Sequence, residues 1–147
     1  MALAAAIVAA CKSGPPAPSP QDTHPPESVS TAPRSSPATT PRAYRQDAAR
    51  HLYGQNAQRI YKGKLPPLLY AIGVLEVDID RNGRVTALRW MRAPRHAPEV
   101  VKEIERTVRT AAPYPVPARM PRVTYTDTWL WDKSGHFQLD TLTEGQL

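Results

Sequence analysis

Two stretches of the chain alternate apolar and polar side chains with a period of two, the pattern of a strand with one buried face. In residues 73–80, one face carries Leu75, Val77 and Ile79. In residues 122–131, one face carries Val123, Tyr125, Asp127, Trp129 and Trp131, and threonines fill most of the other. Both stretches are rich in residues that favour strands, so we expect two strands of one sheet.

The turn after the first of these strands contains Asn82-Gly83, a pair that favours a tight hairpin because both residues tolerate positive φ. The chain should then return as a strand from Arg84 to about Met91. Its apolar positions are unevenly spaced, which predicts a bulge near Thr86-Ala87. After the second alternating stretch, we expect a turn over residues 132–135 and a short fourth strand from His136 to Thr141.

Two other segments repeat apolar residues at helical spacing. Residues 43–61 form the weaker pattern, and Gly54 interrupts it. The stronger pattern begins at Pro98 and carries the apolar stripe Val100, Val101, Ile104, Val108 and Ala111. Prolines follow both segments and end them. This order of elements predicts an α+β fold: a small antiparallel sheet of three to four strands with two helices.

The beginning of the chain has no such periodicity. Residues 2–10 are all apolar and lead directly to Cys11, the only cysteine. Ten apolar residues make about 15 Å of helix, half of the roughly 30 Å hydrocarbon core, so a signal peptide fits better than a membrane span. Val8-Ala9-Ala10-Cys11 resembles the lipobox of bacterial lipoproteins, which implies that residues 1–10 are removed and that Cys11 carries a lipid anchor. An ordinary N-terminus with a free thiol is the alternative.

Residues 11–42 combine Cys11 with a segment rich in Pro, Ser, Thr and Ala. Nine of the 17 prolines lie between Pro15 and Pro41, and large apolar side chains are almost absent. Such a segment cannot bury enough surface to offset its chain entropy, so we expect a disordered tether. One folded domain should then cover residues 43–147. It has 16 basic and 11 acidic side chains, a net charge of about +5, which favours anionic partners.

The pieces of this predicted domain resemble, in their order, the TonB C-terminal domain family. Residues 73–85 read Gly-Val-Leu-Glu-Val-Asp-Ile-Asp-Arg-Asn-Gly-Arg-Val. An amphipathic helix follows, and Pro113-Tyr114-Pro115-Val116-Pro117 leads out of it. The family shows a glycine, an alternating strand, an Asp-x-x-Gly-x-Val hairpin, a helix and a Phe-Pro-like exit. The resemblance covers roughly Ala43 to Trp131.

This resemblance implies a periplasmic domain that pairs an extended peptide of an outer-membrane receptor with an exposed strand edge. The corresponding edge here is Val123 to Trp131. Energy transducers of the family have an inner-membrane helix, whereas this chain has the predicted lipid. Lys12 also replaces the Asp that would resemble an inner-membrane retention signal. We therefore expect an outer-membrane lipoprotein on the periplasmic face, and a fourth strand over residues 136–141 would cover the peptide-binding edge.

The candidate partner-binding residues are on the aromatic face of the last long strand: Tyr125, Asp127, Trp129 and Trp131. If some of these side chains are exposed, they form a docking patch, because aromatic residues dominate interface energies. Asp127 favours a face that is wet at its middle. The alternative is that the aromatic side chains pack in the core.

No catalytic or metal-binding pattern stands out in the sequence. Residues 78–83 reproduce the opening of a calcium loop, but its twelfth position is Arg89 rather than Glu. The histidines lie in separate segments without metal-ligand spacing: His24, His51, His96 and His136. We expect no cofactor beyond the covalent lipid on Cys11, no enzyme activity and no nucleic-acid partner.

These observations predict a non-catalytic envelope lipoprotein that binds a protein or peptide partner, with the membrane reached through its lipid. Two alternatives remain open. One is a basic module that contacts an anionic envelope polymer, such as lipopolysaccharide or peptidoglycan. The other is an accessory to TonB-type energy transduction.

Overall fold

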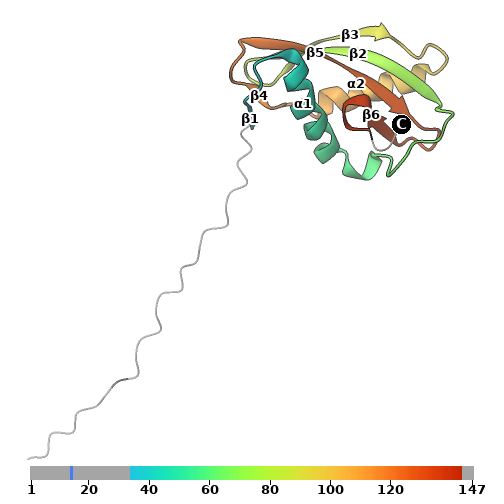
Figure 1. Cartoon of the computed structure of the whole chain (residues 1–147), viewed down its shortest axis with the longest axis horizontal. Helices are drawn as coiled ribbons and strands as arrows, with labels where there is room; N and C mark the ends of the chain where they lie inside the picture. The colour runs from blue at the N-terminus through green and yellow to red at the C-terminus, as the bar shows by residue number, and fades with distance from the viewer. Residues whose placement is uncertain (1–13, 15–33, 144–147) are drawn as a thin grey trace, which may run out of the picture. The chain divides into compact units, whose positions relative to one another are not determined.

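A computed structural model describes residue 14 and residues 34–143 (Figure 1). A four-stranded antiparallel sheet has the order β3-β2-β5-β6. Its strands are β2 (Ala71–Asp80), β3 (Val85–Arg92), β5 (Arg122–Trp131) and β6 (Phe137–Leu139). The two α-helices are α1 (Pro41–Gln55) and α2 (Pro98–Thr110), and short 3-10 turns occupy η1 (Ala57–Arg59) and η2 (Asp140–Leu142). The predicted α+β fold class, with two helices and a small antiparallel sheet, is confirmed.

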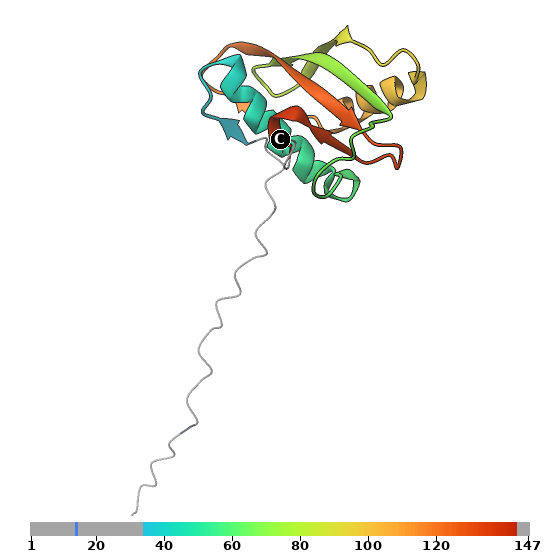
Figure 2. The ribbon, with the colours of Figure 1, turned by 45° about the vertical axis from the view of Figure 1, so that its right-hand side comes forward.

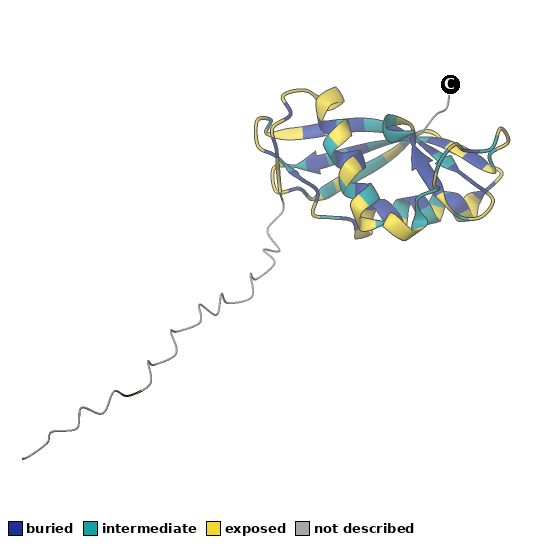
Figure 3. Cartoon of the chain, turned by 60° about the horizontal axis from the view of Figure 1, so that its bottom comes forward, coloured by how far each residue is buried: buried dark blue, intermediate teal, exposed yellow. Residues whose placement is uncertain are grey.

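Both helices lie on one side of the sheet, which Figure 3 shows in front of the strands. Along β2 and β5, buried residues on the helix side alternate with more exposed residues on the other side. Leu75, Val77 and Ile79 are buried on the helix side, as the sequence predicts. The opposite side of the sheet carries partly exposed, mostly polar residues, so the core is a single layer between the sheet and the helices.

The β2–β3 hairpin closes with a three-residue loop instead of the two-residue turn typical of Asn82-Gly83. Within this loop only Gly83 has positive φ, at 79°, and Asn82 does not. Gly83 N–H donates to Asp80 C=O at 3.1 Å, and Asp80 N–H donates to Arg84 C=O at 3.0 Å. Asp80 Oδ1 also accepts the Asn82 N–H at 2.8 Å, which fixes the turn.

The predicted bulge in β3 is confirmed. Asp78 faces Ala87 and Ile79 faces Val85, so Thr86 is the extra residue. A second irregularity occurs between Val74 and Leu75, near the end of β3. Bulges of this kind twist an edge strand, and β3 is an edge of this sheet.

The folded part begins earlier than the sequence predicts. Strand β1 (Ser35–Ser36) pairs in parallel with β4 (Val116–Pro117), and Val116 N–H donates to Arg34 C=O at 2.6 Å. Ser36 is 1% exposed and its hydroxyl donates to Asp47 Oδ2 at 2.5 Å. The boundary at residue 43 is therefore wrong, because residues 34–42 belong to the domain and not to the predicted tether.

One compact unit, Ala32–Leu147, contains the entire core cluster of the described residues. Helix α1 begins inside the predicted tether, where Thr40 Oγ1 accepts the Ala43 N–H at 3.2 Å. The cap satisfies an N–H group that has no partner within the helix. The unit therefore has a closed core and a capped first helix of its own.

Candidate functional site: the outer edge of strand β5

Strand β5 is paired on one side over its whole length and on the other side over only three residues. Strand β2 pairs with it from Arg122 to Trp131. Strand β6 pairs only with Trp129, Leu130 and Trp131 (Figure 2). The predicted fourth strand thus exists but is shorter than residues 136–141, and it leaves most of the outer edge of β5 uncovered.

The direction of the main-chain groups along β5 follows from the hydrogen bonds at its end. Asp132 N–H donates to His136 C=O at 2.9 Å, and Trp131 C=O accepts the Tyr70 N–H at 3.0 Å. Residue 131 therefore faces β2 and residue 132 faces outward. Because these directions alternate in an antiparallel sheet, Thr124, Thr126 and Thr128 point their N–H and C=O groups away from β2.

Asp127 occupies one part of this outer edge. Its carboxylate Oδ1 accepts the outward N–H of Thr128 at 2.8 Å and the N–H of Thr141 in η2 at 3.4 Å. Asp127 is 4% exposed, so the expectation of a wet face around it is wrong. Burial raises the pKa of this carboxyl, and hydrogen bonds from Thr141 and Thr128, with the charge of Arg45, oppose the rise only in part.

The segment of the edge from Arg122 to Thr126 remains free. Within residues 34–143, no hydrogen bond reaches the outward main-chain groups of Thr124 or Thr126. The Thr124 hydroxyl lies on the open side of the sheet, where it donates to Asp78 Oδ1 at 2.7 Å. This short row of unpaired donors and acceptors is the kind of edge to which another strand can add.

The predicted partner-binding side chains lie behind this edge, in the core. Tyr125, Trp129 and Trp131 are 3%, 2% and 6% exposed. The ring of Tyr125 lies 5.7 Å from that of Tyr44, and the ring of Trp131 stacks on Phe137 at 5.4 Å. Side chains in these positions cannot form an exposed docking patch. Strand β5 therefore presents main-chain groups, and not these side chains, to a partner. The alternating pattern of the sequence predicts a strand with one packed face, and it does not show whether the edge of that strand is free.

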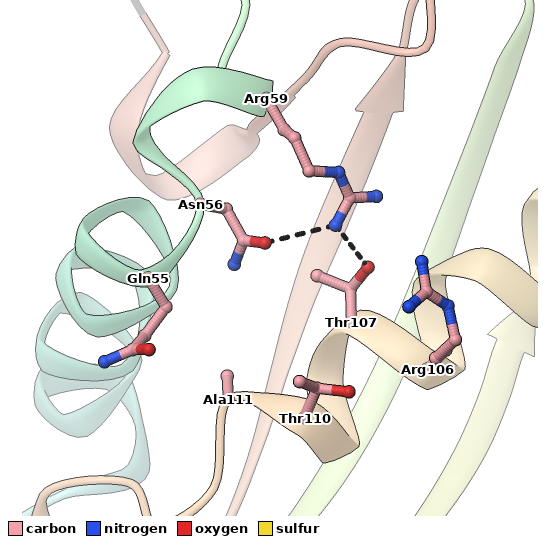
Figure 4. Close-up of a pocket in the computed structure, with 7 residues that line it drawn as sticks. All are labelled: Gln55, Asn56, Arg59, Arg106, Thr107, Thr110 and Ala111. Atoms are coloured by element: carbon pink, nitrogen blue, oxygen red, sulfur yellow. Dashed lines mark hydrogen bonds between the residues drawn. The ribbon is translucent and has the colours of Figure 1, made fainter.

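A small polar cavity of about 70 Å³ lies between η1 and the C-terminal ends of the two helices (Figure 4). Arg59 reaches into it and donates to Asn56 Oδ1 at 3.1 Å and to Thr107 Oγ1 at 2.9 Å. Its charge is balanced by Glu103, whose Oε1 lies 3.0 Å from Nη2. The guanidinium also lies 5.9 Å from the centre of the Trp131 ring. These contacts join the helices to the sheet. Arg106, which also lines the cavity, shares Glu103 with Arg59, so two guanidinium groups face one carboxylate there.

The carboxylates that mimic a calcium loop have other partners. Asp80 Oδ1 accepts the N–H groups of Asn82 and Arg84. Asp78 receives two hydrogen bonds from Arg89, at 2.7 and 2.9 Å. Among residues 34–143, no group of three or more His, Cys, Asp or Glu side chains is placed to hold a metal ion.

The predicted signal peptide (residues 1–10), Cys11 and the tether as far as residue 33 lie outside the described residues, apart from Gly14. In the described part, no helix is both long and apolar enough to cross a membrane. Comparison with protein-family models, with curated proteins and with solved structures found no match.

Proposed function

We propose that the chain is a non-catalytic lipoprotein of the bacterial envelope whose domain binds an extended segment of a protein partner along β5. The observation that carries this proposal is the free edge from Arg122 to Thr126, where the main-chain groups of Thr124 and Thr126 have no partner within the described residues. A partner strand would satisfy these groups and extend the sheet.

The length of the edge limits the strength of the interaction. Beyond Thr126, Asp127 and η2 already occupy the edge, and beyond Thr128 strand β6 does. Each new main-chain hydrogen bond contributes a net stabilisation of about 0.5–1.5 kcal/mol. Two outward residues therefore support a weak contact, and side chains beside the edge must add to it. Arg122 is exposed and has no salt bridge in the described part, although its charge also acts on Asp78; it is placed to meet an acidic side chain of the partner.

The lipid on Cys11 would hold this domain at the membrane, on the periplasmic face of the envelope and preferably at the outer membrane. Its support is the Val8-Ala9-Ala10-Cys11 motif and the Pro-rich segment that follows. A flexible coil of about 20 residues spans on the order of 25 Å. Such a tether would let the domain search for a partner near the membrane surface.

Photo-crosslinking in cells tests the edge. A photo-reactive amino acid at Thr124, whose side chain is exposed beside the free edge, should form an adduct with a protein partner. The same amino acid at Lys102, exposed on α2, is the control for chance contacts. Adducts that are absent from position 124, or equal at both positions, would contradict the proposal.

A further inference from the structure

The large apolar side chains that are exposed in the described part gather at one end of the sheet. They are Leu68, Tyr70, Ile72 and Met91, which are 87%, 43%, 43% and 64% exposed. The first three precede or begin β2, and Met91 lies at the end of β3. We call these four residues the apolar end.

Contacts between the two segments hold this end of the sheet together. His96 Nε2 lies 2.7 Å from Tyr70 C=O, and the rings of the two residues are 5.9 Å apart. In the sheet, Val74 is paired with Arg92. A side chain on Gly73 would meet Trp90 at 2.7 Å and Pro94 at 3.1 Å, so the segment after β3 lies tightly against the start of β2. The two segments that carry the apolar end are therefore neighbours at one end of the sheet.

Positive charge accompanies these apolar side chains. Lys62 and Lys64 precede Leu68 along the loop, and Arg92 and Arg95 follow Met91. All four are exposed, and none forms an ion pair within residues 34–143. The carboxylate of Glu99 lies nearby, where it accepts the Tyr70 hydroxyl. The region thus combines protruding apolar side chains with an excess of cations.

We propose that the apolar end docks the domain onto an anionic lipid surface. Protruding Leu, Tyr, Ile and Met side chains can enter the boundary between headgroups and acyl chains. Neighbouring Lys and Arg side chains are attracted to anionic headgroups. Leu68 follows Pro66-Pro67, whose fixed φ angles limit the conformations of the loop that presents it. A protein partner would need a matching cavity for each protruding side chain, whereas a fluid lipid surface adapts to all of them.

This docking does not depend on strand pairing at β5. Ile72 is paired with Leu130, whereas the free edge around Thr124 is paired with Asp78, six residues further along β2. At about 3.4 Å per residue, this separation is on the order of 20 Å. The two regions lie at opposite ends of the sheet, to the right and left in Figure 1. A domain that is docked through its apolar end therefore keeps its β5 edge free.

Vesicle sedimentation with the folded unit, residues 32–147, tests the proposal without the predicted anchor. This unit contains the whole described core, and its fold is checked by circular dichroism. We expect it to sediment with vesicles of phosphatidylcholine and phosphatidylglycerol, and much less with phosphatidylcholine alone. Added salt should weaken the binding. Failure to sediment with the anionic vesicles at low salt would overturn the proposal.

Matched variants locate the surface. Leu68→Ser with Met91→Ser should weaken vesicle binding about ten-fold or more, because both side chains are exposed and contribute little to the fold. Val101→Ser on α2 should leave vesicle binding unchanged. Lys62→Glu with Lys64→Glu should weaken it more than Lys102→Glu with Arg109→Glu, which changes the charge equally at another exposed place.

Equal effects of the test and control variants would overturn the proposal. Vesicle binding by the Leu68→Ser and Met91→Ser double variant that equals vesicle binding by the parent would overturn it too, and would leave the apolar end to a protein partner. Crosslinking from position 124 reports on the β5 edge separately, so either proposal can fail while the other holds.

Discussion

Gly83 links the β2–β3 hairpin to the segment that leaves α2, although the two lie some thirty residues apart in the sequence. Tyr114 N–H donates to Gly83 C=O at 2.7 Å, and a side chain on Gly83 would lie 2.2 Å from Tyr114 O. The Tyr114 hydroxyl in turn donates to Val108 C=O at 2.9 Å. The glycine of the hairpin and the tyrosine between Pro113 and Pro115 therefore form one contact.

Gly83→Ala should lower the free energy of unfolding by about 3 kcal/mol or more, because both positive φ and a main-chain clash oppose the new methyl group. Gly135→Ala is the matched control. Gly135 also has positive φ, at 86°, but a side chain there meets nothing within 4 Å. Gly135→Ala should lower the free energy of unfolding by only about 1 kcal/mol. Urea unfolding measures both, and equal losses would show that the contact with Tyr114 is unimportant.

The contribution of Asp127 to stability should decrease as the pH rises, which is the opposite of the usual behaviour of a carboxyl group. Burial raises its pKa above the value in the unfolded chain. The folded protein therefore holds this proton more tightly, and stability from Asp127 is lost as the pH rises from about 4 through the raised pKa. Asp127→Asn keeps an acceptor for Thr128 and Thr141 and removes the buried charge.

Asp127→Asn should therefore be as stable as the parent or more stable at pH 7, and the difference should shrink towards pH 4. Urea unfolding of both proteins at several pH values measures this difference, and other titrating groups cancel from the comparison. A variant that is less stable than the parent by the same amount at every pH would contradict this account, because its loss would then come from hydrogen bonding alone.

At the scale of elements, the sequence predicts those that bury an apolar face and misses those that do not. Strand β2 and helix α2 follow from periodicity, since each has a long apolar stripe, and the bulge in β3 follows from a break in the spacing of its apolar residues. Strand β1 is two serines, Ser35–Ser36, and no periodicity marks it. Its pairing with β4 and the burial of Ser36 show that it belongs to the fold. The predicted domain boundary at residue 43 therefore lies too late in the chain.

The candidate site was only partly predictable for a related reason. The sequence identifies β5 as a strand and gives its two faces, and burial follows the predicted alternation. The sequence does not show how far β6 extends along β5. The free edge exists because β6 ends at Leu139. In the sequence, the threonines of β5 are visible only as polar side chains. The groups that would pair with a partner strand at Thr124 and Thr126 are their main-chain N–H and C=O.

Amide hydrogen exchange should show this edge directly. Along β5, the N–H groups of Tyr125 and Asp127 face β2 and should exchange slowly. Those of Thr124 and Thr126 face outward and should exchange at least about 100-fold faster. Leu130, which is paired with Gln138 of β6, should again be slow. Uniform protection from residue 123 to 127 would mean that another segment covers the edge, and the proposed binding mode would then be wrong.

At the scale of the whole molecule, the proposals assign separate tasks to separate places. The predicted lipid on Cys11 keeps the protein at a membrane, the apolar end orients the domain on a lipid surface, and the β5 edge meets a protein partner. A lipid chain and a basic apolar surface are two membrane signals, and two signals together give stable binding where one weak signal does not. The contributions should therefore be separable by substitution.

Replacing Cys11 by Ala in cells tests the first of these tasks. Metabolic labelling with a fatty acid should label the parent and not Cys11→Ala, because Cys11 is the only cysteine and the proposed site of acylation. Mass spectrometry should find residues 1–10 removed from the parent, since cleavage before a lipidated cysteine exposes it as the first residue. Arg50→Ala, on the surface of α1, is a control that should keep the label. A parent protein without label, or with residues 1–10 still attached, would show that Cys11 is an ordinary thiol, and membrane association would then rest on the apolar end alone.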